Sequence, residues 1–173
     1  MVSRLDPLQG CIPLYLKQGQ VHWAYMGQER FVEPFCQDTL DKLANRPLNQ
    51  ILGQRTGLET LLERAESRPG LPLRGLVFHM SRCGSTLIAQ ALASLRDSVV
   101  LSEPPAFDTL LQWLNASPAV DAAYSSALLR GLLSALGQPR RVEDKRLFVK
   151  TDCWHICHSG RIFQAFPGVP WRM

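Results

Sequence analysis

Long apolar runs are missing from this sequence. No uninterrupted apolar stretch among the 173 residues approaches the roughly 18 residues that a membrane-spanning helix needs. The first residues, Met1 to Pro7, also lack the apolar core of a signal peptide. These absences predict a cytoplasmic protein that has no membrane partner.

A regular cysteine framework and a dense basic stripe are missing as well. The five cysteines are an odd number, and their irregular spacing favours reduced thiols over a set of disulfides. They are Cys11, Cys36, Cys83, Cys153 and Cys157. The net charge of +4 is modest and the lysines and arginines do not cluster, so we expect no nucleic-acid partner. A modestly basic chain does suit a polyanionic small molecule.

The sequence does contain enough apolar material for a core. A hydrophobic content of 46% over 173 residues predicts one globular domain, or one domain with a small appendage. The proline- and glycine-containing stretch from Ser67 to Pro72 interrupts the chain. We therefore expect an N-terminal lead-in over residues 1–70 and a second part over residues 71–173.

The lead-in is predicted to contain a hairpin and two helices. Residues 12–16 and 21–25 are apolar and β-prone, and a short polar turn separates them. A helix is expected over residues 38–44 with Asp38 as its N-cap, and a second helix after the capping-box pattern of residues 56–59.

Three roles are open for this lead-in: it could cover the sheet of the second part, form a homodimer, or shape a substrate pocket. Its aromatic residues could line such a pocket, but aromatic residues of a small hairpin more often belong to the core. They are Trp23, Tyr25, Phe31 and Phe35.

The second part begins with a strand, a tight loop and a helix. Residues 75–80 form a short apolar run before Gly84, which predicts a buried strand. From Ser85 the apolar period becomes helical, with Leu87, Ile88, Ala91, Leu92 and Leu95 on one face. The first turn of such a helix attracts anions, because its N–H groups are unpaired and carry partial positive charge. Arg82 and the hydroxyls of Ser85 and Thr86 would add to this attraction.

Further strands and helices then alternate along the chain. Residues 99–101 and 147–149 read as strands, and helices are expected after Pro105 and over residues 119–136. Residues 166–171 look like a loop that leads into another strand. The alternation predicts an α/β fold, a parallel sheet with flanking helices. Lys150 would then stand at the carboxyl end of a strand, near the loop of Arg82.

The nucleotide-triphosphate loop, G-x-x-x-x-G-K-[ST], fits this stretch poorly. His79 occupies the first glycine position and Ser85 occupies the lysine position. A kinase built on this loop would lack the charge that reaches the outer phosphates. A small-molecule kinase with a degenerate loop is therefore a minor alternative.

The run Arg82-Cys83-Gly84-Ser85-Thr86 resembles the 5′-phosphosulfate loop of sulfotransferases that use 3′-phosphoadenosine 5′-phosphosulfate (PAPS). In that family a basic residue is followed by a small residue, glycine and paired hydroxyl residues. The sequence departs from the pattern at Ser81, where proline is common, and at Cys83, where serine is common. The resemblance covers about residues 73–171 and implies a P-loop-type parallel sheet, with PAPS as the co-substrate.

The resemblance also implies roles for residues outside the loop. Glu103, just past the second predicted strand, looks like the general base that takes the proton of the acceptor in bacterial and tyrosine-directed members. Arg82 would stabilise the leaving phosphate. Lys150 could assist sulfuryl transfer, although lysines at strand ends are often merely solvated. The expected catalytic residues are thus Glu103, Arg82 and Lys150.

The family holds the 3′-phosphate with an Arg-Asp-Pro motif and a later serine, neither of which occurs at the required place before Met173. The resemblance therefore implies an N-terminal portion, truncated before that motif. Two readings stay open: a sulfotransferase acting on a hydroxyl or amine, or a fragment that binds nucleotide phosphate without catalysis. The acceptor cannot be read from the sequence, because loops build acceptor pockets.

The segment from Cys153 to His158 suggests two other chemistries. A c-type haem attachment needs Cys-x-x-Cys-His, and this segment has one residue too many. Four ligands within six residues cannot all converge on one zinc ion from a single helical turn. We therefore assign no metal ligand.

Overall fold

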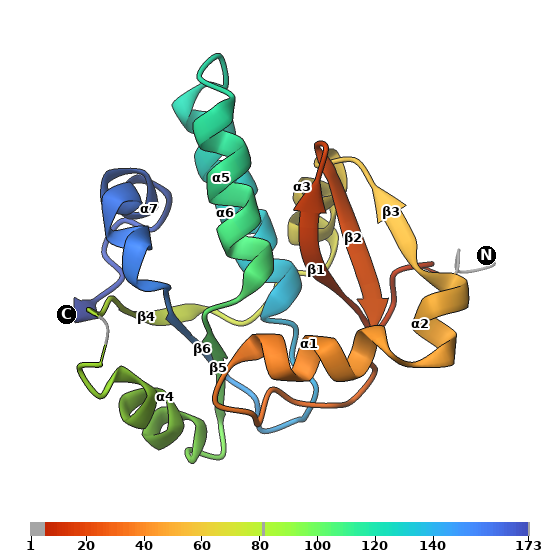
Figure 1. The fold of residues 1–173 in the computed structure, drawn as a ribbon, viewed down its shortest axis with the longest axis horizontal. Helices are drawn as coiled ribbons and strands as arrows, with labels where there is room; N and C mark the ends of the chain where they lie inside the picture. The colour runs from red at the N-terminus through yellow and green to blue at the C-terminus, as the bar shows by residue number, and fades with distance from the viewer. Residues whose placement is uncertain (1–5, 81, 173) are drawn as a thin grey trace.

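The computed structural model describes residues 6–80 and 82–172 and contains two β-sheets with helices around them (Figure 1). One sheet is antiparallel and belongs to the lead-in. The other is parallel and belongs to the second part, which confirms the predicted α/β class.

The antiparallel sheet has the order β1-β2-β3. Its strands are β1 (Cys11–Lys17), β2 (Gln20–Tyr25) and β3 (Gln54–Thr56), so the predicted hairpin is confirmed. Gln18 and Gly19 turn the hairpin with positive φ angles of 54° and 73°, as a two-residue turn of this hand requires. Three helices accompany this sheet: α1 (Cys36–Ala44), α2 (Pro47–Leu52) and α3 (Glu59–Ser67).

The parallel sheet has the order β5-β6-β4-β7. Its strands are β4 (Leu73–Val77), β5 (Ser98–Ser102), β6 (Arg146–Lys150) and β7 (Trp171–Arg172). The helices of this part are α4 (Ser85–Ala93), α5 (Pro105–Ala116), α6 (Ala122–Leu136) and α7 (Ser159–Ala165), with a 3₁₀ helix, η1 (Cys153–His158), before α7. Helix α4 lies on one side of the sheet and α5, α6 and α7 lie on the other (Figure 1).

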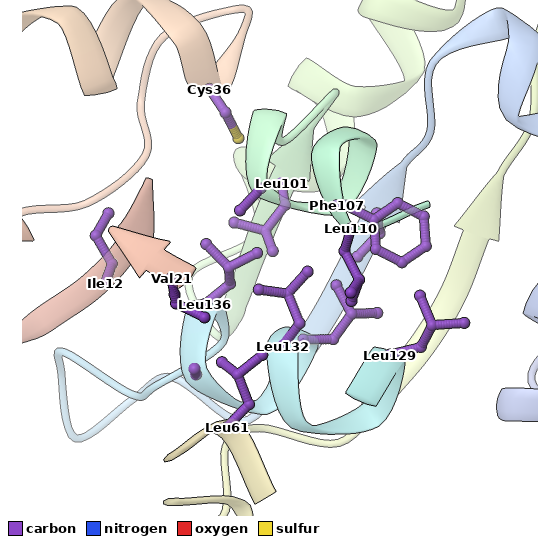
Figure 2. Packing of buried hydrophobic residues seen from close by; sticks show 14 of the residues in the cluster. Ile12, Val21, Cys36, Leu61, Leu101, Phe107, Leu110, Leu129, Leu132 and Leu136 are labelled. Atoms are coloured by element: carbon purple, nitrogen blue, oxygen red, sulfur yellow. The ribbon is translucent and has the colours of Figure 1, made fainter. Parts of the chain in front are cut away.

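One hydrophobic core joins the two parts. Leucines of α5 and α6 pack between the parallel sheet and the hairpin, and Leu136 lies near Val21 and Leu61 of the lead-in (Figure 2). Helices α3 and α6 approach closely at Gly131, where an added Cβ would lie 2.8 Å from the carbonyl oxygen of Leu61. The lead-in therefore covers the helical layer of the second part.

Three details of the lead-in differ from the predictions. Helix α1 begins at Cys36, so Asp38 lies in its first turn and does not cap it. Thr56 does not cap α3, because it belongs to β3 and its hydroxyl accepts a hydrogen bond from Trp23 Nε1 at 2.9 Å. Trp23 and Phe31 are core residues as expected, whereas Tyr25 and Phe35 are exposed. At Thr56, the contact within the sheet thus replaces the capping interaction that the local sequence predicts.

Two details of the second part also differ from the predictions. Strand β4 ends at Val77, three residues earlier than predicted, so His79 and Met80 belong to the loop. The apolar face of α4 is turned outward: Leu87 and Ile88 are exposed, and Ser85 and Ala89 are buried instead. Within the described residues, no helix combines the length and apolarity that crossing a membrane demands.

Candidate functional site

The loop between β4 and α4 has an unusual backbone. Arg82 and Gly84 have positive φ angles of 61° and 83°, and Gly84 directly precedes the first turn of α4. A side chain is strained in this region, whereas glycine is not. A Cβ placed on Gly84 would meet no atom within 4 Å, so the backbone is open to a ligand there. Ser81, which replaces the family's proline, lies outside the described residues.

This loop forms one wall of a pocket of about 290 Å³ at the carboxyl ends of β4, β5 and β6. All seven residues that the sequence singled out line it: Arg82, Cys83, Gly84, Ser85, Thr86, Glu103 and Lys150. Parallel strands deliver their carboxyl ends to the same edge, which is where ligands bind in open α/β sheets. The topology therefore brings together residues that are up to 68 positions apart, from Arg82 to Lys150.

Glu103 and Lys150 form an ion pair inside this pocket. Lys150 Nζ donates to Glu103 Oε1, and the backbone N–H of Glu103 donates to the carbonyl oxygen of Lys150 at 2.8 Å. Lys150 is 1% exposed, whereas the side chain of Glu103 is 24% exposed. The solvated alternative for Lys150 is therefore wrong, because this ammonium group is buried and paired.

Backbone strain accompanies this pair. Glu103 has a φ of 51°, and the other non-glycine residues with positive φ in the described part of the chain are Arg82 and Gln18. Gln18 serves the hairpin turn, while Arg82 and Glu103 both line the pocket. Such conformations cost on the order of 1–3 kcal/mol and cluster at functional sites. The strain is an independent reason to regard this pocket as the functional site.

Sequence reasoning missed His79 as a site residue and did not predict the contact between Phe35 and Lys150. His79 Nε2 lies 3.2 Å from Glu103 Oε1, within ion-pair distance but not aligned for a hydrogen bond. The Phe35 ring faces Lys150 Nζ, 5.0 Å from the ring centroid, a cation–π distance. His79 follows the first strand of the sheet and could have been found from that position. Phe35 comes from the lead-in and lines the pocket, the alternative that the sequence left open for it; its contact with Lys150 has no signal in the sequence.

The pKa values of two exposed thiols in the pocket are shifted in opposite directions. The pKa of Cys83 is lowered, chiefly by a hydrogen bond from the Ser85 backbone N–H at the start of α4. The pKa of Cys153 is raised, first by its hydrogen bond with the Asp152 carboxylate. Cys83 is therefore the more readily ionised thiol of the two.

The segment from Cys153 to His158 has a structural explanation. His155 is fully buried: its Nδ1 accepts from the backbone N–H of Asp152 at 3.0 Å, so its Nε2–H donates to Asp108 Oδ1 at 3.1 Å. Asp152 and His155 form a capping box that begins η1. These bonds position Asp152 and Cys153 at the pocket. The described residues contain no cluster of three or more histidine, cysteine or acidic side chains suited to a metal ion.

An arginine, two hydroxyl residues, a carboxylate and a buried lysine thus surround one cavity at the edge of the sheet where the strands end. Comparison of the chain with protein-family models, with curated proteins and with solved structures gave no match.

Proposed function

We propose that the chain binds the 5′-phosphosulfate end of PAPS in this pocket and transfers its sulfuryl group to a hydroxyl or amine. The observation that carries the proposal is the convergence of the Arg82–Thr86 loop, Glu103 and Lys150 on one cavity. The order of the sheet, in which the loop-bearing strand β4 lies between β6 and β7, is compatible with a P-loop-type arrangement.

The residues of the pocket suit a phosphosulfate group. Arg82 offers a planar fork of donors, the first residues of α4 line the pocket, and the space beside Gly84 is open. The volume of about 290 Å³ lies just below the range of about 300–1,000 Å³ for drug-sized ligands, so the pocket fits the anionic end better than a whole nucleotide. PAPS would supply an activated sulfuryl group there.

Glu103 is the proposed general base. Its Oε1 already contacts Lys150 and His79, so the acceptor proton would go to Oε2. As that proton leaves, the acceptor oxygen or nitrogen forms its bond to sulfur, and the bond between sulfur and the phosphate oxygen breaks. Arg82 and the N–H groups of α4 would stabilise the charge that returns to the phosphate.

A binding experiment tests the first half of the proposal. Calorimetric titration with 3′-phosphoadenosine 5′-phosphate should give tighter binding than ATP. Arg82→Ala and Arg82→Gly should both weaken it by roughly 10- to 100-fold, the effect of one charge-assisted hydrogen bond. Glycine relieves the strain at this φ, so the pair separates loss of charge from loss of stability. Arg74→Ala is the matched control, because this exposed arginine lies near the opposite end of β4. A preference for ATP would favour a kinase.

A transfer experiment tests the second half. PAPS with radioactive sulfur should label a member of an acceptor panel containing phenols, alcohols and amines. Glu103→Gln should retain nucleotide binding and lose transfer, since the amide cannot accept the proton. Full turnover of this variant would refute the assignment of the base. Binding without transfer to any acceptor would point to a nucleotide-phosphate-binding protein that lacks catalysis.

A further inference from the structure

A larger cavity lies elsewhere in the molecule, between the lead-in and the end of α6. Its volume is about 450 Å³. Its walls come from the segments that flank the hairpin, from the last turn of α3 and the residue after it, and from the loop that follows α6 (Figure 1). None of the residues lining it lines the pocket of Glu103. The two cavities are therefore separate.

Three arginines line this cavity, and none of its described lining residues is acidic. They are Arg64, Arg68 and Arg140. The Asp6 carboxylate contacts Arg64 at 2.8 Å and Arg68 at 3.5 Å. Burial raises the pKa of Asp6, but hydrogen bonds from the Leu8 N–H and from Arg64 outweigh it and leave the pKa lowered. Asp6 offsets one of the three guanidinium charges, and the nearby ion pair of Arg30 and Asp144 adds no net charge, which leaves an excess of two positive charges.

The arginine side chains are held in place before any ligand arrives. The Arg64 guanidinium lies 5.6 Å from the centroid of the Trp23 ring, and that of Arg140 lies 5.6 Å from the centroid of Phe31. Both aromatic rings belong to the core. Arginines fixed on buried rings lose little freedom on binding an anion, which favours affinity.

Arg64 is buried and Arg140 is partly buried, so their charges are poorly solvated. Arg64 is 8% exposed, and its buried Nε–H has no hydrogen-bond partner among the described residues. Burial also lowers the pKa of Arg140 to about 10, helped by nearby Arg30 and opposed by Asp144. A buried donor without a partner is an exception in folded proteins that calls for an explanation, and the side chain that carries this donor lines the cavity.

We propose that this cavity binds a small phosphomonoester. A phosphomonoester carries about −1.5 to −2 charges at neutral pH, which matches the excess of two, and its oxygens suit the forks of arginine. The volume exceeds the needs of the anion alone, so an organic group accompanies it. The ring of Tyr25, which packs over Gly10 and Gly27, provides a wall for that group. The proposal is independent of the sulfotransferase proposal.

Site-resolved NMR tests the assignment on the full chain. Phenyl phosphate, inorganic phosphate and benzoate are titrated while the backbone amides of Gly10 and Gly27 and the Nε–H of Arg64 are followed. The amide of Gly84 reports on the other pocket in the same spectra. Phenyl phosphate should shift the first three signals with a dissociation constant of millimolar or below, and both other probes should bind more weakly.

Matched variants complete the test. Arg68→Gln removes a half-exposed guanidinium, keeps the fold, and should weaken phenyl phosphate at Gly10 and Gly27 by about tenfold. Arg74→Gln removes an equal charge outside the cavity and should leave this affinity unchanged. The proposal is overturned if the three signals stay still, if Arg68→Gln has no effect on them, or if benzoate or inorganic phosphate binds as tightly as phenyl phosphate.

Discussion

The Glu103–Lys150 pair gives the sharpest prediction about stability. Glu103→Gln leaves the ammonium group of Lys150, which is 1% exposed, without a charged partner. Breaking a buried pair from one side costs about 3–5 kcal/mol when both groups are fully buried. Because the Glu103 side chain is 24% exposed and the glutamine oxygen can still accept a hydrogen bond from Nζ, we expect about 1–3 kcal/mol.

The reverse substitution should cost less. Lys150→Met replaces the buried ammonium group with an apolar group of similar volume, and the remaining Glu103 carboxylate is partly solvated. We expect a loss of about 1 kcal/mol or less in the free energy of unfolding, because buried pairs can often be replaced by apolar residues at little cost. The double variant should resemble Lys150→Met, so the two changes should be non-additive by about 1–3 kcal/mol, the cost of Glu103→Gln alone.

Urea unfolding at pH 7, followed by tryptophan fluorescence, measures all three variants. With a denaturant slope of about 1–3 kcal/mol per molar for a small protein, Glu103→Gln should move the midpoint by several tenths of a molar or more. The exposed pair Arg46–Glu29 is the control, and Glu29→Gln should leave the midpoint unchanged. If the Glu103 and Lys150 substitutions are additive within about 0.5 kcal/mol, the two charges do not depend on each other and the reasoning is refuted.

Three further predictions concern other parts of the chain. Cys83 should be alkylated by iodoacetamide faster than Cys153 at pH 7, because their pKa values are shifted in opposite directions, and peptide mass mapping would detect equal rates if this is wrong. Gly131→Ala should destabilise the protein by about 1–3 kcal/mol, since the new Cβ would meet a backbone carbonyl of α3, whereas Gly160→Ala has open space and should not lower the thermal midpoint. Asp6→Asn should flatten the acid side of the stability profile: the lowered folded-state pKa means that Asp6 stabilises the fold above its unfolded-state pKa and that this is lost as the pH falls, so an unchanged acid profile would contradict the assignment.

Much of the fold was predictable because local patterns and burial agree. The hairpin of β1 and β2, the break before β4, and the alternation of strands and helices all follow from apolar period and turn residues. The prediction was wrong where a distant partner competes with a local motif. Thr56 fits a capping box in sequence, but its hydroxyl instead accepts a hydrogen bond from the indole of Trp23, which is 33 residues away along the chain.

The sequence predicted the loop of the candidate site, but it did not predict all the residues that line the pocket. The types and order of residues 82–86, which include an arginine, a glycine and two hydroxyl residues, predict a loop that binds an anion. The pairing of Lys150 with Glu103 was not predicted, because it depends on β5 and β6 being neighbours in the sheet. Phe35 approaches Lys150 from the lead-in, and no spacing rule relates the two.

The sequence by itself determined the strand-loop-helix at Gly84 and the α/β alternation, because backbone conformation and apolar period are local properties of the chain. Tertiary structure alone decided that Glu103 and Lys150 pair in a buried site, and that two arginines at the end of α3 share one cavity with Arg140 from the loop after α6. Both contacts join residues that are far apart along the chain. Such residues meet only after packing of the core has set the order of the strands and the position of the lead-in.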